Sequence, residues 1–232
     1  MSTAKYTDRV RKLFAKAEST TSEHEAEALL ARAYALLAKY GIEEAAARAG
    51  ADTDPSEITT WTFKATGAYR LDQILMVNQV AAALHCSAIR LDRNTLQVFG
   101  ARRHLDRVEM LGGLLVAHML ATAGRARSLD PRVSTVTYRK SVMLGFIAEV
   151  DRRLKAAEEA ARQETADSTG VAVVLRSDAQ AARRAMARAF PQAASSGPVR
   201  RSEAGMETGR RAAADIDLGG SRRVSGQRAI AG

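Results

Sequence analysis

Cysteine and long apolar runs are both scarce in this chain. Only Cys86 occurs among 232 residues, so no disulfide can form within the chain, and the cysteine-rich zinc and secreted-scaffold classes are excluded. The longest apolar runs, such as residues 114–121, are interrupted by His118 and are too short to cross a bilayer. Residues 1–11 carry charges and lack the apolar segment of a secretory signal peptide. We therefore expect a cytoplasmic protein that makes no membrane contact.

Metal-ligand spacings are also missing. His24 and Glu25 begin like the zinc-protease pattern H-E-x-x-H, but Ala28 stands where the second histidine would be. His104 and His118 would lie on one helix about 20 Å apart, which is too far to share an ion. We therefore predict no metal site and no cofactor.

Signatures of nucleophiles and phosphate-binding loops are weak. His85 and Cys86 are adjacent at a predicted helix end, which points their side chains apart, so we interpret them as packing residues. A Cys–His pair assembled from distant segments stays open. Gly112 and Gly113 lack the Lys-Ser or Lys-Thr that follows a P-loop, and helix packing accounts for them better. The glycine spacing at residues 205–209 is likewise typical of two helices that approach closely.

Apolar periodicity predicts a helical hairpin at the N-terminus. Apolar residues three and four apart form one stripe over residues 6–19 and another over residues 26–40. Ser22 and Glu25 match the capping box that begins a helix. Gly41 is expected to end the second helix, because glycine readily adopts the left-handed conformation that follows many helix ends.

After a polar linker, the pattern predicts a unit with the order β-α-β-β-α-α-β-α. Alternation around Trp61 and Phe63 indicates a half-buried strand, and the residues at 92–94 indicate the turn of a β-hairpin. The apolar run at 171–175 is interpreted as a buried strand, with Asp178 capping the last core helix. The predicted strands are 58–65, 87–91, 95–99 and 171–175, and the predicted helices of this part are 70–84, 103–123, 136–162 and 178–190. One short helix, 203–214, is predicted in the C-terminal tail.

These elements predict an α+β protein. It has an N-terminal helix-loop-helix, a small domain with an antiparallel or mixed sheet, and a flexible basic C-terminal tail. The tail has few large apolar residues and cannot bury enough surface to offset its chain entropy. The predicted parts are a helical hairpin at 1–47, a linker at 48–57, the α+β domain at 58–191 and a largely disordered basic tail at 192–232.

Positive charge is concentrated in the second half of the chain. The net charge is +9; residues 1–130 contribute 17 basic and 15 acidic residues, whereas residues 131–232 contribute 18 and 11. Such an excess favours a polyanionic partner, because neutralised phosphates release counterions and give affinity that does not depend on base sequence. The alternative is compositional bias, since arginine outnumbers lysine 28 to 7.

Adjacent basic residues recur in this half and are the candidate contacts to DNA or RNA. A chain segment with such pairs can follow a phosphate backbone without recognising bases. No zinc finger, basic zipper or aromatic RNA-binding strand is present to add sequence specificity. The candidate residues are Arg139, Lys140, Arg152, Arg153, Arg200, Arg201, Arg210, Arg211, Arg222 and Arg223.

Two stretches resemble known families. Residues 10–20 (VRKLFAKAEST), continuing through SEHEAEA at 22–28 to AKYGI at 38–42, resemble the bacterial and phage family catalogued as domain of unknown function 2786. QVFG at 97–100 and SVMLGF at 141–146 resemble its usual partner domain, catalogued as domain of unknown function 7168. The resemblance implies an actinobacterial or phage setting and a two-part architecture, and it implies no activity, cofactor or catalytic residue.

Three functions are open from the sequence. We expect a non-enzymatic accessory protein, phage-borne or carried by a mobile element, that contacts nucleic acid through its basic C-terminal half. The alternative is a protein-interaction module that docks a host or phage protein through the N-terminal hairpin. The third is a metal-dependent hydrolase or nuclease with a scattered acidic site drawn from Glu149, Asp151 or Asp106.

Overall fold

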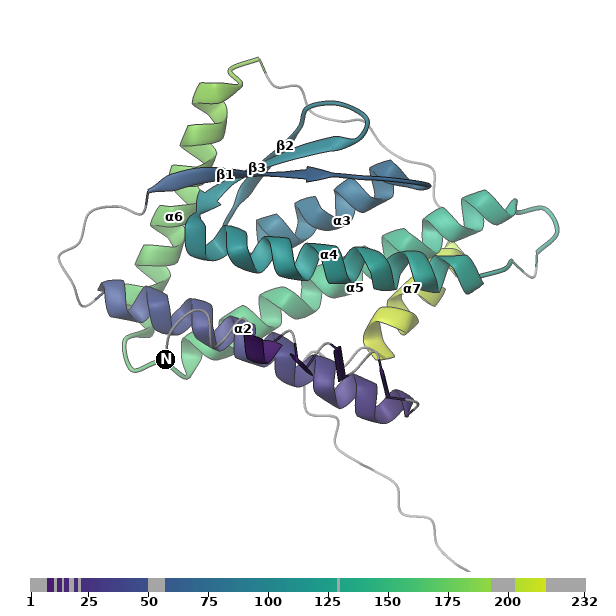
Figure 1. The fold of residues 1–232 in the computed structure, drawn as a ribbon, viewed down its shortest axis with the longest axis horizontal. Coiled ribbons are helices and arrows are strands. Elements are labelled where there is room, and N and C mark those ends of the chain that lie inside the picture. The colour runs from purple at the N-terminus through teal and green to yellow at the C-terminus, as the bar shows by residue number, and fades with distance from the viewer. Residues whose placement is uncertain are drawn as a thin grey trace, which may run out of the picture.

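A computed structural model of the chain shows a mixed helical and β architecture (Figure 1), which confirms the α+β class. The structure describes residues 8–10, 12–13, 15–16, 19–20, 22–49, 57–128, 130–192 and 203–215. The helices are α2 (Glu23–Ala49), α3 (Arg70–Ala83), α4 (Arg102–Arg125), α5 (Thr135–Gln163), α6 (Ser168–Ala189) and α7 (Glu203–Asp215); the strands are β1 (Ile58–Lys64), β2 (Ser87–Arg90) and β3 (Thr95–Ala101).

The sheet is antiparallel, with the strand order β1-β3-β2. Trp61 of β1 lies opposite Val98 of β3, and Phe63 lies opposite Leu96, so these four side chains share the face that packs on the helices. The alternate residue Thr62 is exposed. The predicted half-buried strand with an aromatic face is therefore confirmed, and so is the β2–β3 hairpin.

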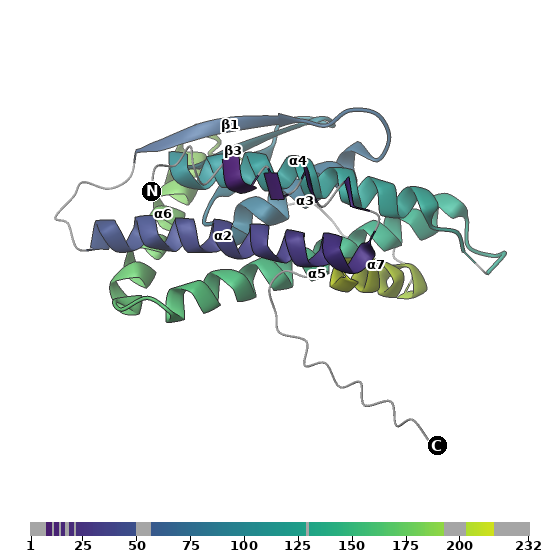
Figure 2. The same cartoon turned by 60° about the horizontal axis from the view of Figure 1, so that its bottom comes forward.

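The helices form layers beneath the sheet. α3 and α4 lie directly against it, and α2 and α5 lie on the far side of these two helices (Figures 1 and 2). α6 crosses the sheet at the end where β3 leads into α4, and Phe190 at its C-terminus packs edge-to-face on Phe99 of β3. The main hydrophobic core fills the space between the layers and includes Val10 and Ala33 of the N-terminal segment.

The N-terminal hairpin departs from the prediction at Gly41. The backbone N–H of Glu25 donates to the Ser22 hydroxyl at 3.3 Å, as expected for a helix start, but α2 continues through Gly41 to Ala49. Gly41 is buried, and a Cβ there would overlap the guanidinium of Arg107 in α4. Glycine is therefore needed at this position for close packing and not for a turn. Most of the predicted linker, residues 50–56, lies outside the described residues.

The predicted strand at 171–175 is wrong, because these residues form part of α6. Val171, Leu175, Asp178 and Ala182 are buried at helical spacing, whereas Val173 is 60% exposed. A five-residue apolar run is too short to distinguish a strand from one turn of a half-buried helix. The predicted helix cap at Asp178 is wrong for the same reason, since Asp178 lies in the middle of α6 and Asp167 caps its start.

The predicted helix at 203–214 is confirmed as α7, and it packs closely on α5. A Cβ at Gly205 would meet Ser141, and a Cβ at Gly209 would meet the backbone of Val142 and Phe146. Gly145 of α5 gives the same close approach to the backbone of Met206. The glycine spacing therefore marks a helix contact, as predicted. The other residues of the predicted basic tail, 193–202 and 216–232, lie outside the described residues.

Candidate nucleic-acid interface

Five of the six predicted nucleic-acid contacts that the structure describes are already bonded within the protein. Arg139 donates to the carbonyl oxygen of Gly124 at 2.7 Å. Arg152 and Arg153 both donate to the carboxylate of Glu149, at 2.6 Å and 2.9 Å. These two arginines hold the pKa of Glu149 below its usual value through hydrogen bonds and charge. The carboxylate in turn neutralises part of their charge.

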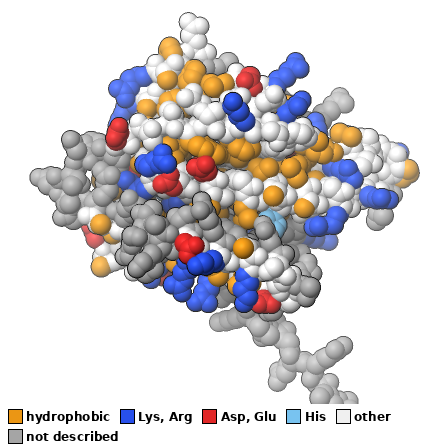
Figure 3. All heavy atoms as spheres, in the orientation of Figure 1, with side chains coloured by type: hydrophobic (Ala, Val, Ile, Leu, Met, Phe, Trp, Pro, Cys, Tyr) orange, Lys and Arg blue, Asp and Glu red, His pale blue; other side chains and the backbone are white. Residues whose placement is uncertain are grey.

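The same pattern occurs on α7. Arg210 and Arg211 form ion pairs with Glu207 at 3.2 Å and 3.0 Å. On the face shown in Figure 3, Lys and Arg side chains fall into several separate groups, some with carboxylates beside them. Within the part of the chain that the structure describes, the two arginines of each pair therefore share one carboxylate of their own helix. Arg200, Arg201, Arg222 and Arg223 lie outside the described residues.

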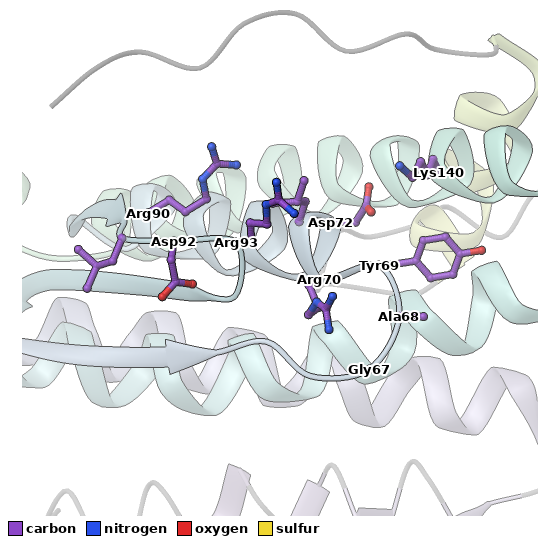
Figure 4. A pocket seen from close by; sticks show the side chains of 11 residues that line it. Gly67, Ala68, Tyr69, Arg70, Asp72, Arg90, Asp92, Arg93 and Lys140 are labelled. Carbon is purple, nitrogen blue, oxygen red and sulfur yellow. The ribbon is translucent and has the colours of Figure 1, made fainter.

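Lys140 differs from the other predicted residues, because it lines a pocket with three further cations. Arg70, Arg90 and Arg93 lie around the same hollow, which has a volume of about 800 Å³ (Figure 4). The guanidinium groups of these three arginines form no hydrogen bond or ion pair with any residue that the structure describes. We call Arg70, Arg90, Arg93 and Lys140 the basic pocket.

Three separate segments position the basic pocket. The chain turns sharply between β1 and α3, where Gly67 and Tyr69 have φ angles of 67° and 55° in the left-handed region. This turn places Arg70 at the first position of α3. Arg90 is the last residue of β2, and Lys140 comes from α5. The four residues therefore come to line one hollow only in the folded chain.

The β2–β3 turn places Arg93 at its tip. The carboxylate of Asp92 accepts hydrogen bonds from the backbone N–H groups of Asn94 and Thr95, at 2.6 Å and 2.9 Å. These bonds lower the pKa of Asp92 and commit its charge to the turn itself. Arg93, between the bonded residues, is left exposed to solvent beside the pocket.

The charge balance of the pocket is positive. Asp72 is the second carboxylate that lines it; partial burial raises the pKa of Asp72, and the nearby charge of Lys140 opposes this shift. Four cations thus face two carboxylates, one of which is bonded to the turn backbone. The pocket also adjoins the N-terminus of α3, where the helix dipole adds positive potential. This arrangement favours an anionic ligand.

A second polar cluster is buried at the opposite end of the sheet. Arg103 and His104, at the start of α4, both bond to the carboxylate of Asp178 in α6, with the His104 Nε2 to Asp178 Oδ2 distance being 3.1 Å. Arg107 bonds to Glu158 of α5 in the same way. These contacts connect α4, α5 and α6. We call the group the buried ionic cluster; its members are Arg103, His104, Arg107, Glu158 and Asp178, together with His85 and Cys86.

The second histidine of this cluster is more accessible. The Nε2 atom of His85 lies 3.5 Å from Oε2 of Glu158, its ring centroid is 5.5 Å from that of His104, and its side chain is 25% exposed. Burial alone raises the pKa of Glu158, but Arg107 and His85 outweigh it and the net shift is downward. Glu158 is therefore held as a carboxylate.

The chemistry of the buried ionic cluster is that of a structural ion-pair network. Burial lowers the pKa of His104 to about 4 despite its hydrogen bond to Asp178, so its imidazole is neutral at pH 7. Burial also raises the pKa of Cys86 to about 12, and its thiol lies 3.5 Å from the carbonyl oxygen of Leu84. A protonated, buried thiol is a poor nucleophile, so the open possibility of a Cys–His pair gains no support.

The three acidic residues of the third hypothesis are separately paired. Glu149 bonds to Arg152 and Arg153, Asp151 to Lys155 at 2.8 Å, and Asp106 to Arg102 at 2.9 Å. Among the residues that the structure describes, no group of three or more His, Cys, Asp and Glu side chains could hold a metal ion. Within that same part of the chain, no helix has the length and apolar character needed to cross a membrane.

Three residues of the basic pocket were absent from the sequence prediction. Arg93 sits in the hairpin turn and Arg70 at a helix start, and both positions were predicted correctly as local structure. In a β-α-β-β unit whose strands pair antiparallel, the start of the helix and the hairpin turn lie at the same end of the sheet. This shared location was the available signal for the pocket.

Comparison with known proteins adds an N-terminal match. The family described as "Protein of unknown function (DUF2786)" matches residues 5–44, which include most of α2. The resemblance of the N-terminal segment is thereby supported, whereas the match does not extend to the partner domain. Neither curated proteins nor solved structures yield a match to the chain.

Proposed function

We propose that this protein is a non-enzymatic accessory protein that binds the phosphate groups of nucleic acid through the basic pocket. The single observation behind this proposal is that Arg70, Arg90, Arg93 and Lys140 line one hollow, with none of the three arginines engaged by a carboxylate in the described structure. Unpaired cations are the ones able to release counterions from a phosphate backbone. The resemblance at the N-terminus supports a phage or mobile-element setting.

The identity of the side chains favours phosphate over a single halide or carboxylate. Each guanidinium presents a planar fork of N–H donors that matches two phosphate oxygens, and three such forks are available here. Spread over one hollow, they can contact more than one phosphate of a chain. The sequence pI of about 10.1 adds a favourable long-range field for any polyanion.

The proposal is tested by measuring the binding of fluorescent DNA and RNA oligonucleotides over a salt series. In a triple variant, Arg70→Ala, Arg90→Ala and Arg93→Ala, we expect affinity to fall about tenfold or more. The slope of log affinity against log salt should decrease by about 2, because each lost phosphate contact removes about 0.7 to 0.9 from it.

A matched control removes the same charge from cations that are already paired. Arg132→Ala, Arg152→Ala and Arg211→Ala together delete three exposed arginines, each of which forms an ion pair in the structure. We expect this variant to bind within about threefold of the unaltered protein, since only the general field changes. Equal losses in both triple variants, or no binding by the unaltered protein at low salt, would refute the proposal.

A further inference from the structure

The basic pocket has apolar side chains on its walls. Large hydrophobic residues that are well exposed are few in the described part of the chain: Leu71 is 50% exposed, Leu91 45%, Val136 56% and Val173 60%. Both leucines line the pocket, and neither valine does. Tyr69, which is partly buried, also lines it. Exposed apolar surface in a hollow is a common property of ligand sites.

The leucines and the arginines are interleaved along the chain. Arg70 precedes Leu71 at the start of α3, and Arg90 precedes Leu91 at the end of β2. One cation and one apolar group therefore come from each of two walls, with Arg93 at the tip of the hairpin turn between them in Figure 4. A ligand that satisfies both kinds of group must have phosphates next to flat or apolar surface.

From these contacts we infer that the occupant of the basic pocket is an unpaired nucleotide segment of single-stranded nucleic acid. This inference rests on the proposed function and specifies its ligand. The phosphates bind the arginines, and unstacked bases cover Leu71 and Leu91. A duplex keeps its bases stacked inside and presents phosphates at its surface, so it would leave both leucines uncovered.

The shape of the site distinguishes this ligand from an anionic membrane surface. Membrane-associated proteins insert apolar side chains from a protruding amphipathic face. Leu71 and Leu91 instead line a hollow, where a flat lipid surface would not reach them as it reaches a protruding face. A single strand can enter such a hollow and keep its phosphates on the cationic side.

The test compares a single-stranded 20-mer with the duplex of the same sequence. For the unaltered protein we expect at least about fivefold tighter binding of the single strand at equal salt. In the double variant Leu71→Ala, Leu91→Ala we expect affinity for the single strand to fall about tenfold and affinity for the duplex to change less than twofold, with the salt slope unchanged. The control Val173→Ala removes an exposed valine of α6 that does not line the pocket and should leave both affinities unchanged.

The outcomes separate this inference from the proposed function. Equal or tighter duplex binding that still requires the three arginines would overturn the single-strand assignment and leave phosphate binding intact. Loss of arginine dependence would overturn both. Binding to phosphatidylserine vesicles that depends on the leucines, without preference for the single strand, would also overturn the inference in favour of a membrane. Because both leucines are exposed, thermal melting of the double variant should match that of the unaltered protein and show that it is folded.

Discussion

His104 is a fully buried, neutral imidazole within a network of charges. Asp178 accepts its hydrogen bond at 3.1 Å. Arg107 and Arg103 of α4 and His85 at the end of α3 lie near it and disfavour its protonation. Burial is the largest effect on its pKa, and the two arginines act in the same direction. Protonation of His104 in the folded state is therefore unfavourable at neutral pH.

This burial predicts a pH dependence of stability. The pKa of His104 is 6.5 as its ordinary value and about 4 in the folded protein. Between these values the unfolded chain binds more protons than the folded chain, so stability is full above pH 6.5 and falls as the pH is lowered. We expect the His104 contribution to cost about 2 kcal/mol at pH 5 relative to pH 8, from about 1.4 kcal/mol per pH unit.

Urea denaturation at pH 8 and pH 5 measures this effect. The variant His104→Gln keeps a polar side chain that can donate to Asp178 but cannot titrate. Its loss of stability between the two pH values should be smaller by the amount assigned to His104. An identical pH dependence in the two proteins would show that the imidazole is not buried as a neutral group.

The pairing of residues in the buried ionic cluster could not be predicted from the sequence. Their chemical types are visible in the sequence, but Arg103 and Asp178 are 75 positions apart and meet only because α6 packs against β3, which leads into α4. Asp178 was predicted to cap a helix, since an aspartate after a short apolar run fits that pattern equally well. Its partner could not be identified without the tertiary arrangement of the helices.

Among the elements, α7 depends on glycine more than the other helices. A Cβ at Gly209 would meet the backbone carbonyl of Val142 and the backbone nitrogen of Phe146, and backbone atoms of α5 cannot shift without disturbing the helix. In contrast, Gly113 in α4 is exposed, and a Cβ there would meet nothing within 4 Å. The two glycines are thus a matched pair for testing helix contact against helix propensity.

We expect Gly209→Ala to detach α7 from α5. Trypsin should then cleave after Arg210 and Arg211 faster than in the unaltered protein, as followed by mass spectrometry over time. Gly113→Ala should leave this cleavage unchanged and stabilise the protein by up to about 1 kcal/mol, because alanine favours the helix interior. Slow cleavage in Gly209→Ala would mean that α5 and α7 tolerate the added methyl group.

Element prediction succeeded where two local signals agreed and failed where one was taken alone. The β2–β3 hairpin combined alternation with turn residues, and the start of α2 combined a cap with periodicity. The end of α2 was predicted at Gly41, whereas Gly41 lies against the guanidinium of Arg107 inside the helix. A glycine required by a distant contact and a glycine required by a turn look the same in the sequence.

At the scale of the whole molecule, the distribution of charge along the chain does not describe its distribution in space. Four of the arginines after residue 130 share two carboxylates, since Glu149 and Glu207 stand three and four residues before their arginines, so part of the charge of these arginines is neutralised locally. This spacing was readable in the sequence and argues against counting those arginines as free. The convergence of Arg70, Arg90, Arg93 and Lys140 was not readable as a set, because it depends on how three segments pack.

A truncation tests whether the basic pocket or residues 216–232 supply the contacts to phosphate. Removing residues 216–232 deletes three arginines and one aspartate but keeps α7, which ends at Asp215. If the pocket supplies the phosphate contacts, affinity for single-stranded oligonucleotides should fall less than about threefold. A loss as large as that of the pocket triple variant would assign binding to the C-terminal residues instead.

The burial of Cys86 has a practical consequence for work on this protein. With its one native thiol protonated and enclosed by the core, the folded chain offers maleimide reagents no ready target. A cysteine introduced on the surface would then be the single site of dye attachment, without any need to replace the native residue. A fluorophore placed at the tip of the β2–β3 hairpin and, in a second protein, one placed on a helix away from it would report directly on how a single-stranded nucleic acid lies across the molecule.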